Sequence, residues 1–268
     1  MILESPERNP NSSRFQRVQI GSIMVHDVTV PEILALVREA VRHRRRLTLC
    51  YANAHAIRLA ATDSQFARDL AAADVVFCDG YGVQLASRLL GQPLRARMTP
   101  PAWLEELVQA LEPEHARFFL VGDEPRTVSR AAEGLEAHYP PAKAVGVHHG
   151  FFPLQGQENE NLLKAINAAD ATVLLVGMGM PRQERWLTSN AARLDAPVIL
   201  AVGALFTRLA GIEPRPHPWI ANHGLEWLTR LVRHPVVMFD RYVMGIPRFA
   251  GILVQQWWRA RREGRQFP

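Results

Sequence analysis

An aspartate that enters a glycine-rich turn is the part of this sequence best suited to catalysis. The apolar run at 75–77 leads into Cys78-Asp79-Gly80-Tyr81-Gly82. Three consecutive apolar residues predict a buried strand, and Gly80 and Gly82 allow a sharp turn and close approach to a ligand. Asp79 is therefore expected at the carboxyl end of a strand, where open α/β sheets bind ligands. A carboxylate there is a candidate general base, although an isolated Asp-Gly pair also suits an ordinary turn.

Two further glycine turns are candidates for binding a diphosphate. Each follows an apolar run and precedes a helical pattern: Gly122-Asp123-Glu124-Pro125 and Gly177-Met178-Gly179-Met180-Pro181. The free backbone N–H groups at the start of a helix bind anions. Neither turn matches the dinucleotide fingerprint or the P-loop. This mismatch argues against a Rossmann oxidoreductase, which is one alternative for the chain.

Polar side chains continue the second of these turns. Arg182, Gln183 and Glu184 are expected in the first turn of the following helix, beside the anion site. The alternative for Glu184 is that it only complements the positive end of the helix dipole. Gly150 and Phe151 lie at another strand exit. The Phe151 ring either faces a nucleobase or sugar or belongs to the core.

The sequence gives no indication of a metal site. It contains no D-x-D motif, and His148-His149 has no cysteine or carboxylate partner at ligand spacing. Enzymes that hold a diphosphate through a divalent metal usually need paired carboxylates. We therefore expect no cofactor and no metal, with helix N-termini and arginines neutralising a bound diphosphate.

Composition is that of a soluble globular protein. The 268 residues carry a formal net charge of +5, and Lys143 and Lys164 are the only lysines. Arginine suits phosphate recognition, although a GC-rich genome also accounts for the bias. Cys50 and Cys78 lie in apolar runs, so buried, reduced thiols in a cytoplasmic protein are expected. Neither a signal peptide nor an apolar run of about 18 residues is found.

Short apolar runs alternate with helical patterns along most of the chain. This alternation predicts parallel βαβ units, and hence an α/β fold with a Rossmann-like parallel sheet and helices on both faces. Residues 1–16 are expected to form a loose tail, 17–210 the α/β core, and 211–268 a helical appendage. The expected strands are 18–20, 24–25, 47–50, 75–77, 118–121, 144–147, 172–176 and 198–202, and the expected helices include 54–73, 83–90, 102–111, 127–138, 159–168 and 181–192.

The appendage combines arginine with large aromatic residues. Eight arginines lie between Arg230 and Arg265, against Asp240 and Glu263, and they alternate with Trp227, Trp257 and Trp258. Arginine and tryptophan at the margins of an apolar face are typical of a helix lying at a lipid headgroup layer. Nucleic-acid binding is the alternative. The apolar segment 249–254 favours a membrane surface or burial against a partner subunit.

Taken in order, these strings resemble the WecG/TagA/CpsF family of bacterial glycosyltransferases. The resemblance runs from about Val18 to Phe249, and its most specific strings are Gly-Met-Gly-Met-Pro-Arg-Gln-Glu at 177–184 and Gly-Leu-Glu-Trp at 224–227. Further matching positions are Asn53, Asp74, Asp79, Gly80, Gly82, Arg97, Gly122, Tyr139, Gly146, His149, Gly150, Phe151, Gly203, Gly211, Arg215, Trp219, Arg230, Pro235 and Arg241.

The resemblance implies transfer of a sugar from a UDP-sugar to an undecaprenyl-diphosphate-linked sugar on the cytoplasmic leaflet, with inversion at the anomeric carbon. N-acetylmannosamine and glucose are among the donor sugars it implies, in the synthesis of a surface polysaccharide. It also implies peripheral membrane association, self-association, and no nucleic-acid partner. It assigns the base to Asp79, acceptor or diphosphate contacts to Arg97, Arg215, Arg230 and Arg241, and donor contacts to Asn53, Gly80, Gly82, Gly122, Gly150, Phe151, Gly177, Gly179, Pro181, Gln183 and Glu184.

Several positions depart from the family pattern. Threonine usually stands where this chain has Tyr51, and glycine and aspartate where it has Pro100 and Ala102. Asp79 and the Gln-Glu turn are retained, so the departures bear on the donor and acceptor rather than on catalysis. They also leave open a nucleotide-sugar-binding protein without activity. The remaining departures are Thr207, Pro216, His217 and Val236.

Overall fold

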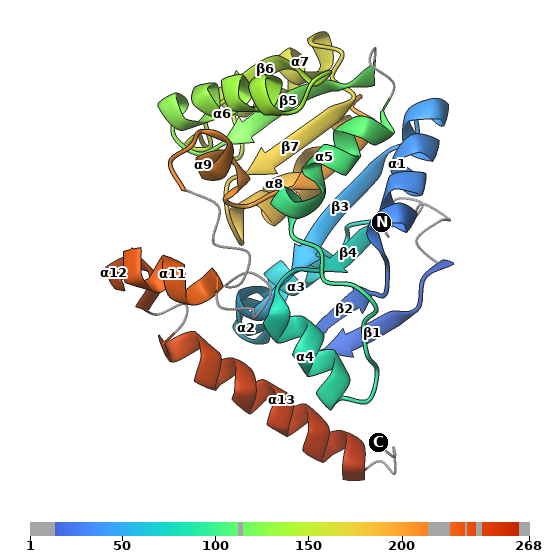
Figure 1. Cartoon of the computed structure of the whole chain (residues 1–268), viewed down its shortest axis with the longest axis vertical. Helices are drawn as coiled ribbons and strands as arrows, with labels where there is room; N and C mark the ends of the chain where they lie inside the picture. Colours follow the sequence, from blue (N-terminus) through green and yellow to red (C-terminus); the bar gives the residue numbers. More distant parts are fainter. Residues whose placement is uncertain (1–13, 112–114, 214–225, 234, 240–242, 263–268) are drawn as a thin grey trace.

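The computed structural model of this chain describes residues 14–111, 115–213, 226–233, 235–239 and 243–262. Its centre is a parallel six-stranded sheet with the order β4-β3-β8-β7-β5-β6 (Figure 1). The predicted α/β class with a parallel sheet is confirmed. The strands are β3 (Leu47–Ala52), β4 (Val75–Cys78), β5 (Arg117–Gly122), β6 (Lys143–His148), β7 (Val173–Gly177) and β8 (Val198–Ala201).

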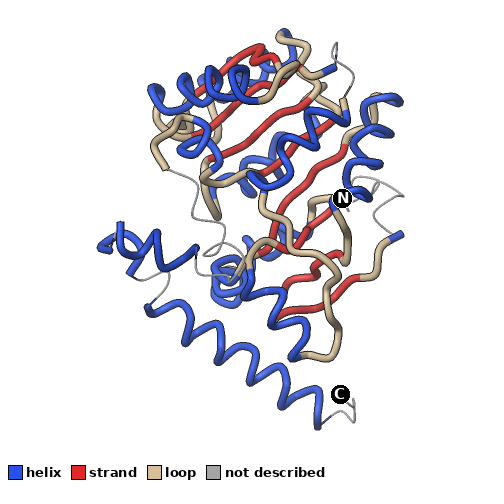
Figure 2. Tube along the Cα trace, viewed as in Figure 1, coloured by secondary structure: helices blue, strands red, loops and turns tan. Residues whose placement is uncertain are grey.

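Helices cover both faces of this sheet, which explains why its strands are apolar runs rather than alternating patterns. Strands β3, β4, β7 and β8 are buried along their whole length. Figures 1 and 2 show the sheet between two helical layers. One layer holds α1 (Val30–His43), α5 (Pro100–Ala110), α6 (Pro125–His138) and α9 (Leu205–Leu209), and the other holds α3 (Ser64–Ala71), α7 (Gln157–Ala168) and α8 (Arg182–Asn190).

A small antiparallel hairpin covers the β4 edge of the sheet. Its strands are β1 (Arg17–Ile20) and β2 (Ile23–His26). The Nδ1 atom of His26 accepts the backbone N–H of Val76 at 3.0 Å. Burial lowers the pKa of His26 to about 4, so the ring is neutral and can accept this bond. The hairpin therefore occupies a backbone donor that an open sheet edge would leave exposed.

The predicted helix at 54–73 is wrong as a single element. It divides into α2 (Ala54–Thr62) and α3, because Asp63 is extended and its side chain accepts the N–H of Phe66 at 2.9 Å. This aspartate caps the second helix, which is a stronger local preference than continuing the first. Helix α4 (Tyr81–Leu89) begins two residues earlier than expected, and a short 3₁₀ turn, η3 (Ala191–Arg193), follows α8.

The described part of the appendage contains three helices: α11 (Glu226–Arg233), α12 (Pro235–Phe239) and α13 (Gly245–Arg262). Helix α13 packs against α2, with Phe249 buried. The Gln256 side chain accepts the N–H of Gly21 at 2.7 Å and donates to the carbonyl of Gln19 at 2.8 Å. Within the described residues, every helix is too short or too polar to cross a bilayer.

Two expectations fall on residues that the structure does not describe. Residues 1–13 of the expected tail and the proline-containing linker at 214–218 lie outside the described ranges. The boundary between core and appendage at about residue 211 stays a prediction.

We expect Gly134→Ala to destabilise the fold. A Cβ atom at this position in α6 would lie 2.1 Å from the carbonyl oxygen of Leu209 in α9, so the two helices would have to separate. Overpacking of this kind costs about 1–3 kcal/mol. Thermal or urea unfolding measures the change in the free energy of unfolding. The matched control is Gly251→Ala in α13, where a Cβ would meet no atom within 4 Å outside the backbone of its own helix. The free energy of unfolding of this variant should rise by about 0.5–1 kcal/mol. Equal effects of the two substitutions would contradict the packing argument.

Candidate active site

The parallel sheet gathers the strand exits along one edge. Asn53 follows β3, Asp79 follows β4, Gly150 lies just beyond β6, and Gly122 and Gly177 are the last residues of β5 and β7. In Figure 1 the strand arrowheads point toward the side on which α11, α12 and α13 lie. The structure thus brings together, at the carboxyl edge, most positions that the sequence identified.

Asp79 is fixed by both its backbone and its side chain. Its N–H donates to the carbonyl of Ala52 at 2.9 Å, which extends the pairing of β4 with β3 by one residue. The Nδ2 group of Asn53 donates to Asp79 Oδ2 at 3.3 Å. Asn53 also caps α2, because its Oδ1 accepts the N–H of Ala56 at 3.0 Å. A side chain held in this way is a pre-oriented carboxylate rather than a free surface group.

A cationic side chain and this carboxylate both lie near the thiol of Cys78. Burial is the main reason that the pKa of the Cys78 thiol is raised to about 12; the charge of Asp79 contributes to this rise, and the charge of Arg97 opposes it. Both charges therefore act on the same thiol at the end of β4. The N–H of Met98 donates to the carbonyl of Cys78 at 2.8 Å, so the segment that carries Arg97 is bound to the end of this strand.

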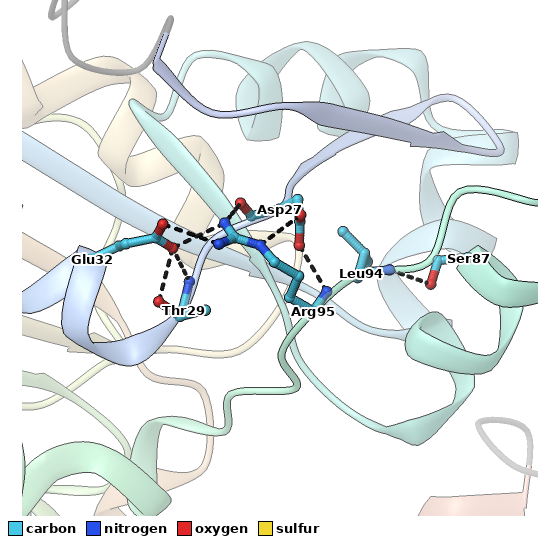
Figure 3. A network of polar contacts seen from close by, with 6 residues as sticks. All are labelled: Asp27, Thr29, Glu32, Ser87, Leu94 and Arg95. Atoms are coloured by element: carbon cyan, nitrogen blue, oxygen red, sulfur yellow. Dashed lines mark hydrogen bonds and ion pairs between the residues drawn. The ribbon is translucent and has the colours of Figure 1, made fainter.

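Arg95 anchors that segment on its other side (Figure 3). Its Nε donates to Asp27 Oδ2 at 2.8 Å, and its guanidinium also bonds both carboxylate oxygens of Glu32. Its backbone N–H donates to Asp27 Oδ1 at 2.8 Å. One residue earlier, the N–H of Leu94 donates to Ser87 Oγ at 3.0 Å. Only Ala96 lies between Arg95 and Arg97 in the sequence, so this network limits the movement of Arg97 relative to Asp79.

The glycines at the strand exits differ in what they are needed for. A Cβ on Gly122 would lie 2.3 Å from the carbonyl oxygen of Gly177, and one on Gly177 would lie 2.8 Å from that of Gly203. A Cβ on Gly150 would lie 3.0 Å from the backbone of the Gly122 turn. These glycines permit adjacent turns to pack closely. Gly179, by contrast, has a φ of +75°, and a Cβ on it would meet no atom within 4 Å, so there is open space on this side of its backbone.

Arg182 joins two of the strand exits. Its Nε donates to the carbonyl of Gly150 at 2.9 Å, and its guanidinium also donates to the carbonyl of Phe152. The exit loop of β6 is thereby attached to the start of α8. Phe151 is 71% exposed, so the core alternative for its ring is wrong; Phe152 is the buried aromatic residue.

Gln183 and Glu184 lie in the first turn of α8 and are fully buried. Gln183 Nε2 donates to Glu184 Oε1 at 2.7 Å. Gln183 Oε1 and Glu184 Oε2 have no hydrogen-bond partner. Burial is the main reason that the pKa of the Glu184 carboxyl is raised to about 7; the hydrogen bond from Gln183 opposes this rise, and the charge of Asp69 adds to it. Their assignment as donor-binding residues stays a prediction.

The remaining predicted residues divide into described and undescribed ones. Gly80 has a φ of +90° and starts α4, and Pro181 precedes α8. A Cβ on Gly82 would lie 3.6 Å from the Phe249 ring, so this glycine gives α13 room beside the Asp79 turn. Arg215 and Arg241 lie outside the described residues, as does the side chain of Arg230.

Sequence reasoning missed two anchoring residues and one cluster. Arg95 belongs to no motif, and its partners are 63 and 68 positions away along the chain. The sequence predicts Arg182 beside the anion site but gives no sign of its attachment to the β6 exit. The expectation that His148-His149 has no carboxylate partner is wrong, because Glu158 Oε1 lies 3.7 Å from His149 Nε2. The fold of the intervening loop creates this proximity.

Comparison with known proteins gives the same family as the sequence motifs. The profile of the glycosyl transferase WecG/TagA/CpsF family matches residues 18–263. The N-acetylglucosaminyldiphosphoundecaprenol N-acetyl-beta-D-mannosaminyltransferase of Staphylococcus aureus strain NCTC 8325 / PS 47 is 28% identical over 220 residues, covering 81% of this chain and 85% of that protein. The protein of the same name from strain COL has the same identity and coverage.

We expect Glu184→Gln to stabilise the protein in a pH-dependent way. The folded-state pKa of about 7 lies above the ordinary value of 4.5, so the neutral acid is favoured in the folded state. The contribution of the neutral Glu184 carboxyl to the free energy of unfolding is fully present below about pH 4.5 and is lost as the pH rises through about 7. The variant cannot ionise, so its free energy of unfolding should rise relative to that of the wild type by up to about 3 kcal/mol as the pH increases between these two values. Above about pH 7 the difference between the two proteins should stay constant. Urea unfolding from pH 4.5 to 8 measures it; a difference that does not vary with pH would refute the buried-acid interpretation.

Proposed function

Because this chain belongs to the glycosyl transferase WecG/TagA/CpsF family, we propose that it transfers a sugar from a UDP-sugar to a lipid-diphosphate-linked sugar acceptor, with inversion at the anomeric carbon. That the chain is a glycosyltransferase follows from the family itself. The donor, the acceptor and the inversion are our proposal. The observation that carries it is the pre-oriented Asp79 carboxylate at the edge where the strand exits meet.

Inversion in one displacement needs a base for the acceptor hydroxyl. Asp79 removes the proton from that hydroxyl as its oxygen attacks the anomeric carbon, and the bond to the UDP oxygen breaks on the opposite face. The Asn53 hydrogen bond to Oδ2 limits rotation of the carboxylate and directs it toward the acceptor. Arg97 lies on the same strand exit and provides a positive charge for a phosphate group of the acceptor or the donor.

The departing UDP acquires negative charge as this bond breaks. The diphosphate is proposed to bind at the N-terminus of α8, next to the open space at Gly179, where the helix dipole favours an anion. The N–H of Gln183 already donates to the carbonyl of Gly179 at 2.9 Å, so other backbone N–H groups of this turn would contact the diphosphate. Strands β4 and β7 are separated by β3 and β8, so their exits lie roughly 14 Å apart at the usual strand spacing. An extended nucleotide sugar spans such a distance, with its anomeric carbon at Asp79 and its nucleotide toward α8.

The donor sugar is proposed only as a hexose or N-acetylhexosamine. The Staphylococcus aureus relatives are named as N-acetylmannosaminyltransferases. In this chain Tyr51 replaces the usual threonine, and its hydroxyl lies 2.2 Å from the place where a Cβ on Gly203 would stand. The phenol thus occupies space at the centre of the carboxyl edge that a threonine would leave open. This difference is the reason not to transfer the sugar of the relatives directly.

We further propose that the appendage places the protein on the inner face of the cytoplasmic membrane. A lipid-linked acceptor is presented at that surface. The exposed face of α13 carries Val254 and Trp258, each more than half exposed, and its last turn carries Arg259, Arg261 and Arg262. Apolar and aromatic residues with a cationic margin suit an anionic lipid headgroup layer. The same helix contacts the Asp79 turn through Phe249.

We expect Asp79→Asn to lower the transfer rate by at least about 100-fold, the usual contribution of a general base. The amide keeps the shape of the side chain but cannot accept the acceptor proton. Binding of UDP should persist, because Asp79 does not hold the nucleotide. Transfer from UDP-sugars to a synthetic lipid-linked acceptor, and calorimetry with UDP, measure the two effects.

The control for the Asp79 variant is Asp195→Asn, at the opposite end of the sheet, which should retain wild-type turnover. Turnover of Asp79→Asn within about tenfold of wild type would refute the assignment of the base. No turnover by the wild type with any UDP-sugar would instead favour a binding protein without activity.

We expect the double variant Val254→Ser, Trp258→Ala to bind anionic vesicles at least about tenfold more weakly, because the lost apolar area corresponds to more than about 1.4 kcal/mol. Vesicle co-sedimentation measures the partitioning. Point variants are preferable to deletion of the appendage, since deletion would expose the surface of α2 that α13 covers. Val147→Ser, at an exposed position on β6, is the matched control. Unchanged partitioning of the double variant would exclude α13 as the membrane contact.

A further inference from the structure

Three side chains with metal-ligand chemistry converge beyond the end of β6. His148 is the last residue of this strand, His149 follows it, and Glu158 lies in the first turn of α7. One ligand atom from each lies within 4.8 Å of the others, and His149 Nε2 is 3.7 Å from Glu158 Oε1. We propose that these three residues form a binding site for a divalent transition-metal ion of the Zn²⁺ type.

The orientation of His148 favours this assignment. Its Nδ1 lies 2.8 Å from the carbonyl oxygen of His149. A carbonyl only accepts, so Nδ1 carries the proton and the Nε2 lone pair of the neutral ring is available to a metal. Metal-binding histidines commonly donate their other ring N–H to a carbonyl in this way, which fixes both the tautomer and the orientation of the ring.

His149 needs only a small change to become the second ligand. Its Nδ1 accepts the N–H of Phe151 at 3.3 Å, which places the ring proton on Nε2, facing Glu158. Coordination through Nε2 moves this proton to Nδ1 and ends the Phe151 contact. That contact is long and correspondingly weak. The Phe152 ring packs edge-on against both imidazoles, with centroids 5.1 and 6.4 Å away.

The donor set selects the class of ion. Two imidazoles and one carboxylate are typical zinc ligands, and they leave a fourth position for water or an anion. Mg²⁺ and Ca²⁺ prefer a shell of oxygen atoms, which this cluster does not offer. The ligand side chains of His149 and Glu158 are 31% and 44% exposed, so an ion has access and the side chains can close around it.

The site is separate from the proposed base. Strands β4 and β6 are the two edges of the sheet, so Asp79 and His148 lie roughly 24 Å apart at the usual strand spacing. The ion would instead connect the exit loop of β6 to α7. Arg182 binds the carbonyls of Gly150 and Phe152 in the same loop. A bound ion would therefore stiffen the loop that carries the exposed Phe151. The proposed metal site does not depend on the proposed glycosyl transfer.

Titration of the full, tag-free chain with Zn²⁺, and with Co²⁺ as a spectroscopic probe, tests the site. We expect one ion per chain, a visible Co²⁺ absorption band of a low-coordinate nitrogen and oxygen site, and a rise in melting temperature with Zn²⁺. Glu158→Gln and His149→Gln should each weaken Zn²⁺ binding by at least about tenfold, since loss of even an outer partner of a ligand typically costs about 10- to 100-fold.

Two controls separate this site from general surface binding. Glu160→Gln removes the neighbouring carboxylate of α7, which pairs with Arg193, and His138→Gln removes a histidine on α6; both should bind Zn²⁺ like the wild type. Circular dichroism and melting of the metal-free variants verify that they fold. The proposal is overturned if folded Glu158→Gln and His149→Gln retain wild-type affinity, if the controls lose as much affinity, or if the wild type gives no Co²⁺ band.

Discussion

The parallel pairing of all six strands is the constraint on which the rest of this molecule depends. In a parallel sheet, every strand ends at the same edge, so residues that follow different strands meet although they are far apart in the sequence. Asn53 and Asp79 are 26 positions apart, yet one hydrogen bond joins their side chains. The same geometry puts the open turn at Gly179 on this edge. A base and an anion site can then act on one extended substrate.

Close packing of backbone turns is what allows these exits to crowd together. Gly122, Gly177 and Gly203 each stand where a Cβ would collide with the next turn or with a side chain. Gly122 and Gly203 also have positive φ values of +149° and +54°, which a side chain would strain. A Cβ on Gly179, by contrast, would meet no atom within 4 Å. A glycine-rich exit therefore combines two roles: most of its glycines hold neighbouring turns together, and the one that faces outward exposes backbone N–H groups to a ligand.

Long-range anchors hold the loops around this edge. Arg95 attaches the segment of Arg97 to Asp27 and Glu32, and Arg182 attaches the exit of β6 to the start of α8. Both use guanidinium groups, whose planar set of donors can satisfy several oxygens at once. Helix α13 adds a third contact at Gly82, through Phe249. The proposed acceptor surface, the base and the diphosphate turn are thus mechanically connected, while the histidine cluster lies at the far edge of the sheet.

The sequence by itself determined the fold class, the buried thiols of Cys50 and Cys78, and the identity of Asp79 as the residue after a buried strand, because apolar runs, glycine turns and helix starts are local patterns. Only the tertiary structure decided that Gln183 and Glu184 face the interior, that Phe151 is exposed while Phe152 is buried, and that Asp63 divides a predicted helix. It also paired Arg95 with Asp27 and Glu32, and His149 with Glu158. The physical reason is that burial and side-chain contacts depend on which element packs over a residue, and local spacing does not contain that information.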